Sequence, residues 1–322
     1  MNESDDLEDS PPSATSPAVS RRVLLVGGAS AAATGIAGIA AGISVGAREV
    51  PPAPPSISPR QRFGDKVVMI TGATSGIGRA IAVASAREGA RVAFCGRHEA
   101  LGRDVEQEIR SAGGTVRYFH ADVRVEADVQ RFVDYTVAQF GRVDIAFNNA
   151  GITLEKPLHE LTAAEWDDVL NTNLRGVFFA MKHEIPVMLT AEGGGTIVVT
   201  SSSNAIATQA KRGAYAASKR GLVGLMQAAA LEYGPRNIRV NAILPGTTDT
   251  LLVRRVAGME NVPDAAWHAA AAEWARNNIP GLHRMANPEE IAEFALMMAS
   301  DQYPFMTGAA LVIDGGKTAQ GG

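Results

Sequence analysis

The sequence predicts an α/β fold, with a doubly wound parallel sheet of about seven strands and helices on both faces of that sheet. Three observations support this prediction. From Phe63 onward, short apolar runs alternate with longer amphipathic stretches, a glycine-rich turn follows the first run, and polar residues follow several later ones. Strands and helices that alternate through short links are typical of a parallel sheet with both faces covered.

The apolar runs are short, rich in β-branched residues and bounded by Gly, Asp or Pro, as expected of buried strands. The predicted strands are Lys66–Thr71, Arg91–Cys95, Thr115–His120, Val143–Asn148, Thr196–Ser201, Arg239–Leu244 and Ala309–Ile313. Helices are expected between them, near residues 77–88, 98–112, 125–140, 163–190, 213–234 and 288–299. One doubly wound domain uses the whole span 63–318, which leaves no room for a second domain.

The N-terminal part of the chain differs in composition from this domain. The pair Arg21-Arg22 leads into residues 23–47, a Gly- and Ala-rich run without charge that ends on small residues. This arrangement is similar to a twin-arginine export signal, so residues 1–47 are predicted to be a signal segment and residues 48–62 a Pro-rich linker. The expected location of the protein is then periplasmic or otherwise extracytoplasmic.

Two other interpretations of the uncharged run stay open. It is long enough to span a bilayer, so residues 23–47 could form an uncleaved membrane anchor. It could also be a flexible tail, in which case the arginine pair would be accidental. Contact with a membrane is expected only through this segment.

Composition argues against some classes of partner and site. Hydrophobic residues make up 46% of the chain, as in ordinary globular proteins, and the formal charge of −4 offers no basic field for nucleic acid. The single cysteine, Cys95, excludes an internal disulfide framework, and its place at the end of a strand indicates a small apolar side chain. No spacing of His, Cys and carboxylates predicts a metal site.

The glycine-rich turn Thr71–Gly78 has the features of a dinucleotide site. Gly72 allows a tight turn, Gly76 lets the backbone approach a pyrophosphate, and Gly78 permits close packing of helix on strand. The N-terminus of the following helix offers unpaired N–H groups and a positive dipole end to the phosphates. The turn lies between a predicted strand and a predicted helix, which is the context that such a motif requires.

Five motifs in order along the chain give a resemblance to a known family. They are the turn Thr71–Gly78, Asn148-Asn149-Ala150-Gly151, Tyr215-x-x-x-Lys219, Pro245-Gly246 and Asp314-Gly315-Gly316. Over about residues 63 to 318 the chain resembles the short-chain dehydrogenase/reductase family. The resemblance implies a Rossmann-type catalytic domain that transfers a hydride between NAD(P) and a small-molecule carbonyl or secondary alcohol. It also implies a homo-tetramer or homo-dimer, formed through helices 163–190 and 213–234.

The resemblance implies a dinucleotide site that several segments build. Asp122 matches the position that hydrogen-bonds the adenine amino group, although it could also cap the next helix. Asn149 matches a residue that ties the central strands together, and Thr250 one that holds the nicotinamide carboxamide. The expected cofactor-binding residues are Gly72, Thr74, Ser75, Gly76, Ile77, Gly78, Arg97, Asp122, Val123, Asn149, Ala150, Gly151, Tyr215, Lys219, Pro245, Gly246 and Thr250.

The segment after the second strand bears on the choice between the two dinucleotides. An acidic residue there would bind the ribose hydroxyls of NAD, but the sequence has Gly96-Arg97-His98. The guanidinium of Arg97 fits a phosphate, so NADP(H) is expected in preference to NAD(H). Two points weigh against this reading: Arg97 could be a solvated loop residue, and Ser75 stands where other NADP-using members have a basic residue.

Four residues make up the expected catalytic set. Tyr215 and Lys219 are four apart and share a helix face, and the Lys219 ammonium together with oxidised nicotinamide would lower the pKa of the phenol. The resemblance assigns Tyr215 as general acid/base and Lys219 also as a ligand of the nicotinamide ribose. It assigns Ser202 to the substrate oxygen, with Ser203 as the next candidate, and Asn173 to a water that connects the lysine to solvent.

The substrate is expected to contact residues 247–285, where Trp267 and Trp274 lie on one helix face and either roof a pocket or pack in the core. Nothing in this stretch names a substrate, so 3-oxoacyl thioesters, sugars, steroids and other alcohols or ketones stay open. A non-catalytic dinucleotide-binding or sensing protein is the alternative function. A pure binder has no need of the complete catalytic set, which argues against that alternative.

Overall fold

The computed structural model describes residues 61–319. The predicted signal segment and nearly all of the predicted linker lie outside these residues. Within the described range, no helix is long and apolar enough to cross a membrane.

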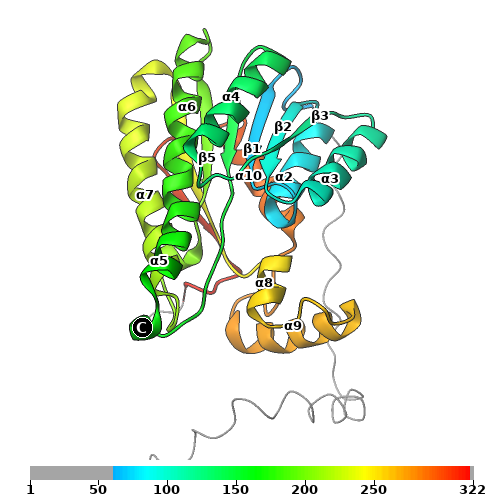
Figure 1. The fold of residues 1–322 in the computed structure, drawn as a ribbon, viewed down its shortest axis with the longest axis vertical. Coiled ribbons are helices and arrows are strands. Elements are labelled where there is room, and N and C mark those ends of the chain that lie inside the picture. Colours follow the sequence, from blue (N-terminus) through cyan, green and yellow to red (C-terminus); the bar gives the residue numbers. More distant parts are fainter. Residues whose placement is uncertain (1–60, 320–322) are drawn as a thin grey trace, which may run out of the picture. The chain divides into compact units, whose positions relative to one another are not determined.

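Seven parallel strands form one sheet in the order β3-β2-β1-β4-β5-β6-β7 (Figure 1). Their bounds are β1 Val67–Thr71, β2 Arg91–Gly96, β3 Thr115–His120, β4 Ile145–Asn148, β5 Gly195–Thr200, β6 Ile238–Pro245 and β7 Ala310–Ile313. The predicted α/β class, the strand count and the parallel arrangement are confirmed. Each predicted strand is found, and no strand end differs from its predicted position by more than two residues.

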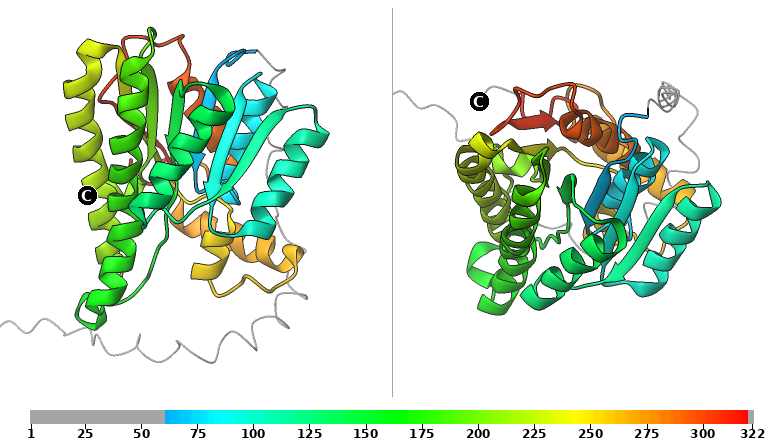
Figure 2. Two further views of the ribbon diagram at one scale, coloured as in Figure 1. Left: turned by 45° about the horizontal axis from the view of Figure 1, so that its top comes forward. Right: turned by 90° about the horizontal axis from the view of Figure 1, so that it is seen from above.

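The helices cover both faces of the sheet, and each face has its own core (Figure 2). The helices are α2 Gly76–Arg87, α3 Glu99–Ser111, α4 Glu126–Phe140, α5 Ala163–Leu170, α6 Gly176–Thr190, α7 Gly213–Tyr233, α8 Leu251–Val256, α9 Asp264–Asn278 and α10 Pro288–Ala299. Helices α2, α3 and α10 pack on one face, and α4, α6 and α7 on the other. Successive residues of β1 alternate between the two cores, because side chains along a strand point to opposite faces.

The predicted continuous helix over residues 163–190 is wrong in one respect. A π-helical turn, Asn171–Arg175, separates α5 from α6. The side chain of Asn173 in this turn is fully buried and bonds both backbone groups of Ile152, a residue distant in sequence. These bonds compensate for the wider turn, and π turns of this kind often mark functional sites.

The sheet order creates a crevice between β1 and β4. The chain leaves β1 toward α2 on one face and leaves β4 toward α5 and α6 on the other, so the strand order reverses at this point. Ligands of doubly wound sheets bind at the carboxyl ends of the strands beside such a reversal. Helices α8 and α9, which follow β6, lie beyond this edge of the sheet (Figure 1).

One buried acid lies away from the crevice. Glu184 on α6 is fully buried, and its carboxylate accepts a hydrogen bond of 2.9 Å from the side chain of Asn148 at the end of β4. Burial raises the pKa of Glu184 to about 7, because the surroundings disfavour the charged form more than this one hydrogen bond favours it.

Candidate active site

A cavity of about 820 Å³ opens at the carboxyl ends of the central strands, within the size range of small-molecule sites. Most of the predicted site residues line it: Gly72, Thr74, Ser75, Gly76, Ile77, Arg97, Val123, Asn149, Ala150, Gly151, Ser202, Tyr215, Lys219, Pro245, Gly246 and Thr250. Gly78, Asp122 and Asn173 do not line the cavity and lie behind its wall. Ser203, the alternative to Ser202, is buried outside it.

The three glycines of the turn stand where a side chain would be poorly tolerated. Gly72 and Gly76 adopt positive φ values of 68° and 55°, which side chains rarely tolerate. A Cβ on Gly72 would lie 2.5 Å from the Cα of Ala150, and one on Gly78 would lie 2.3 Å from the carbonyl oxygen of Gly72. The turn therefore packs so closely on the strand ends that any side chain at these positions would collide with backbone.

The first turn of α2 is free to bind an anion. Its N-cap residue, Ser75, makes no side-chain capping bond, and no acidic residue occupies the first turn. Unpaired backbone N–H groups and the positive end of the helix dipole thus face the cavity. Together with the side-chain-free surface of Gly76, this cradle fits the pyrophosphate of a dinucleotide.

Asn149 connects the two central strands, as expected. Its side-chain nitrogen donates to the carbonyl oxygen of Gly72 at 3.0 Å, and its backbone N–H donates to the Thr71 hydroxyl at 3.1 Å. These bonds hold the glycine-rich turn after β1 against the segment after β4, so the floor of the crevice is fixed before any ligand binds.

The structure corrects one reading of Asp122. It does not cap α4, whose N-cap is Val125. The Asp122 carboxylate instead accepts from the backbone N–H of Arg124 at 3.0 Å and pairs with the Arg124 guanidinium at 2.6 Å, and these contacts lower its pKa against the effect of burial. Arg97 lies 3.9 Å from the same carboxylate, at the rim of the cavity.

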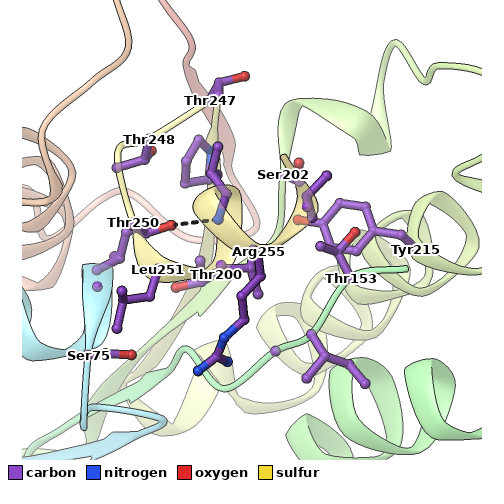
Figure 3. A pocket seen from close by; sticks show the side chains of 18 of the residues that line it. Ser75, Thr153, Thr200, Ser202, Tyr215, Thr247, Thr248, Thr250, Leu251 and Arg255 are labelled. Carbon is purple, nitrogen blue, oxygen red and sulfur yellow. Dashed lines mark hydrogen bonds between the residues drawn. The ribbon is translucent and has the colours of Figure 1, made fainter. Parts of the chain in front are cut away.

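Ser202 and Tyr215 lie side by side at one end of the cavity (Figure 3), and Lys219 lines the same cavity. Ser202 follows β5, and its hydroxyl interacts with the Tyr215 phenol. Lys219 lies one helical turn after Tyr215 on α7, with its ammonium 5.8 Å from the centre of the tyrosine ring, and donates to the carbonyl oxygen of Thr200 at 2.8 Å. A strand end and a helix thus place a hydroxyl, a phenol and an ammonium at the cavity wall.

The pKa values of this cluster differ from the expectation of an acidic phenol. Burial raises the pKa of Tyr215, against the Ser202 hydrogen bond and the nearby charge of Arg212. Burial also lowers the pKa of Lys219 to about 8. Without a bound ligand the phenol is therefore protonated at neutral pH, which is the form that can donate a proton to a carbonyl oxygen.

Asn173 supports this cluster from behind. Its side-chain nitrogen donates to Ser218 at 3.0 Å, and the Ser218 hydroxyl donates to the carbonyl oxygen of Tyr215 at 2.7 Å. The side-chain oxygen of Asn173 and the Lys219 ammonium both lie 3.3 Å from the place of a Cβ on Gly151. The π turn thus brings the predicted asparagine next to the lysine, close behind the cavity wall.

The segment after β6 forms the other wall. Thr250 caps α8 by accepting from the backbone N–H of Val253 at 3.4 Å (Figure 3), and its methyl group lies over Gly76. Both tryptophans predicted to roof a pocket or to pack in the core line the cavity. Trp267 does both, because it is also buried. Trp267 is buried and donates to Asp249 at 2.7 Å, whereas Trp274 is partly exposed.

Sequence reasoning missed four charged residues of the cavity. They are Glu155, Arg212, Arg255 and Lys317. Arg212 lies three residues before Tyr215, and that spacing is a signal that could have found it. Arg255 and Lys317 carry no such signal, because their positions depend on how the segment after β6 and the C-terminal turn converge. Figure 3 shows the Arg255 side chain reaching from α8 toward Ser75.

Across positions 61–319, no group of three or more His, Cys, Asp or Glu side chains is arranged to hold a metal ion.

Fold and site together define a nicotinamide-dependent oxidoreductase, and the comparisons with known proteins agree. A family model described as "Enoyl-(Acyl carrier protein) reductase" matches residues 72–318, which include every residue that lines the cavity. The chain belongs to the short-chain dehydrogenase/reductase family and is an NAD(P)-dependent oxidoreductase that acts on alcohols and carbonyls. Nothing in the comparisons supports the non-catalytic alternative.

Three relatives illustrate the family. The chain is 40% identical to the A-factor type gamma-butyrolactone 1'-reductase (1S-forming) of Streptomyces virginiae, over 79% of this chain and 96% of that protein. It is 39% identical to the cis-4-hydroxycyclohexanecarboxylate dehydrogenase of Sinomonas cyclohexanicum, over 80% and 99%. The crystal structure of levodione reductase superposes with a TM-score of 0.74 at 36% identity, over 80% of this chain and all of that one.

Proposed function

We propose that this enzyme interconverts a small-molecule carbonyl and its secondary alcohol with NADP(H) in preference to NAD(H), and that Tyr215 is the general acid/base. The observation that carries the proposal is the meeting of Ser202, Tyr215 and Lys219 beside the glycine-rich cradle in one cavity. The test follows oxidation of NADPH and NADH by the chain from Arg48 onward, with ketones, 3-oxoacyl esters and sugars as substrates.

In the proposed mechanism the residues of the cavity bind, orient and move a proton. The Ser202 hydroxyl holds the substrate oxygen, and the Tyr215 phenol donates its proton to that oxygen as a carbonyl is reduced. The Lys219 ammonium stabilises the resulting phenolate, since an adjacent positive charge favours the ionised form. Asn173 positions Lys219 and connects it to solvent. The bound nicotinamide supplies the hydride in reduction and accepts it in oxidation.

The preference for NADP(H) is supported by the rim of the adenosine end. Arg97 lines the cavity directly after β2, no acidic residue follows that strand at once, and Arg97 has only a 3.9 Å contact with Asp122. Its guanidinium is thus available to a 2′-phosphate, which would bind it more tightly than the distant carboxylate does.

Replacement of Arg97 by alanine is expected to raise the dissociation constant of NADPH by about 10- to 100-fold and that of NADH by less than about 2-fold. Only NADPH carries the phosphate that the guanidinium would pair with. Titration of each nucleotide by protein fluorescence measures the change. Arg103→Ala, an exposed arginine on α3 outside the cavity, is the matched control. Equal losses for both nucleotides in Arg97→Ala would refute the proposed preference.

The N-terminal part is proposed to be a cleaved twin-arginine signal of residues 1–47, followed by the linker 48–62 and the catalytic domain 63–318. The support is the pair Arg21-Arg22 before an uncharged run that ends on small residues. Cell fractionation tests it: a shortened protein in the exported fraction is expected, and Arg21→Lys with Arg22→Lys should retain the protein inside. A full-length protein that resists a carbonate wash would instead establish the membrane anchor.

A homo-dimer or homo-tetramer is also proposed, formed through α5 to α7. Large apolar side chains stand on the outer faces of these helices: Phe178 on α6 is 46% exposed and Leu231 on α7 is 82% exposed. Burial of such side chains against a second copy would remove apolar surface from water. Light scattering after size-exclusion chromatography measures the molar mass directly.

A further inference from the structure

Lys317 contributes a partly buried ammonium to the cavity, and this ammonium forms no ion pair with a carboxylate among the described residues. Lys317, in the turn after β7, lines the cavity. The one hydrogen bond of its ammonium among the described residues goes to the Thr247 hydroxyl at 3.5 Å, which is at the limit of a hydrogen bond. The ammonium also lies 5.7 Å from the ring centre of Trp274. No carboxylate in residues 61–319 comes within ion-pair distance of it.

The nearest acids are engaged elsewhere. Asp314 accepts from the backbone N–H of Gly316 at 2.9 Å and from Thr318 at 2.8 and 2.7 Å, so its carboxylate serves the C-terminal turn. Glu155 pairs with Arg212. Burial and the charge of Arg212 lower the pKa of Lys317, and the opposing effect of the Asp314 and Glu155 carboxylates does not cancel them.

Arg212 brings this cationic end next to the reacting groups. Its guanidinium carbon lies 5.8 Å from the ring centre of Tyr215, and its Nε is buried without a hydrogen-bond partner. Of the three charged residues described here, two are cations, Arg212 and Lys317, and one is a carboxylate, Glu155. A buried charge without a partner is unfavourable, and a bound anion would remove that cost.

We propose that the substrate carries a carboxylate or a similar small anion, which pairs with Lys317 while the substrate carbonyl lies at Ser202 and Tyr215. This inference rests on the proposed function of that same site and names its substrate class. The indole of Trp274 forms the apolar surface beside the anion subsite, and the Arg212 guanidinium lies 5.8 Å from the ring centre of Tyr215. Oxo acids and hydroxy acids are then preferred to neutral ketones and alcohols of the same shape.

The test compares acids with their methyl esters, which keep the shape and lose the charge. The probes are 4-oxopentanoate and 4-oxocyclohexanecarboxylate, each with its methyl ester, in the NADPH assay. For the wild-type enzyme, kcat/KM is expected to favour one or both acids by about 10- to 100-fold. Lys317→Met should remove this preference by lowering kcat/KM for the acid much more than for the ester. Lys211→Met is the matched control, because Lys211 is exposed and does not line the cavity.

Two results overturn the inference while the proposed function stands. One is equal use of acid and ester by the wild-type enzyme, and the other is an acid preference that survives in Lys317→Met. If no carbonyl is turned over, the proposed function fails, and binding still decides the inference. The acids are then titrated into the NADP⁺-loaded protein with tryptophan fluorescence as the readout. Saturable binding that Lys317→Met weakens at least 10-fold supports the subsite, and equal or absent binding refutes it.

Discussion

Tyr215→Phe is expected to lower kcat by about 10³-fold or more and to leave dinucleotide binding intact. The substitution removes only the phenolic oxygen, which is the group that donates the proton to the substrate oxygen. The ring still packs beside Lys219 and Arg212, so the shape of the cavity changes little. Steady-state assays with NADPH measure the loss, and nucleotide titration of the same sample shows that the site is still folded.

The companion variant Ser202→Ala separates the contribution of the Ser202 hydroxyl from that of the Tyr215 phenol. It keeps the phenol but removes its hydroxyl partner, so a smaller loss than in Tyr215→Phe is expected. If Tyr215→Phe instead retained more than about a tenth of the wild-type kcat, the phenol could not be the general acid, because that role contributes about 10²- to 10⁴-fold.

Glu184→Gln is expected to stabilise the protein by about 3 kcal/mol at pH 8 and by little near pH 4.5. Burial raises the pKa of Glu184 to about 7 from its ordinary value of 4.5, so the folded state favours the neutral acid. Between pH 4.5 and about pH 7, Glu184 keeps its proton in the folded protein but has lost it in the unfolded chain. The free energy of unfolding of the wild-type protein therefore falls as pH rises through this window, and the deficit is complete above pH 7.

Glutamine has nearly the same shape as glutamate and stays neutral, so the variant lacks this pH dependence. Urea unfolding at several pH values from 4.5 to 8 gives the difference in unfolding free energy between variant and wild type. Glu192→Gln, an exposed glutamate after α6, is the control for a general effect of charge removal. A difference that does not grow with pH would show that the Glu184 carboxylate is already satisfied when ionised.

The sequence determined the fold closely because most of its signals are local. Short β-branched runs between glycine and proline predict strands regardless of what packs on them, and every predicted strand is present. The π turn at Asn173 escaped prediction because a widened turn shifts the phase of a helix by only about one residue, or about 100°. Its stabilising contacts with Ile152 and Ser218 connect segments that only the folded chain brings together.

The same distinction explains the site. The glycine-rich turn, Tyr215 and Lys219 were predictable because each motif lies within one turn or one helix, where the spacing along the sequence fixes the distance between its residues. Lys317 was not, because its place in the cavity depends on three distant segments that meet: the C-terminal turn, Thr247 and helix α9. Residues expected to bind the dinucleotide thus belong to local sequence motifs, whereas the positions of residues that would select a substrate depend on tertiary contacts.

The single cysteine of the chain, Cys95, has a consequence for the handling of the protein. Cys95 lies in β2 with its side chain in the core on one face of the sheet, is 1% exposed, and burial raises the pKa of its thiol to about 12. Thiolates are the form that oxidants and alkylating reagents attack, so the Cys95 thiol of the folded enzyme resists both near neutral pH. Its covalent state is then the same in a reducing cytoplasm and in an oxidising exterior. A cysteine introduced on its surface would accept a maleimide dye as a unique label.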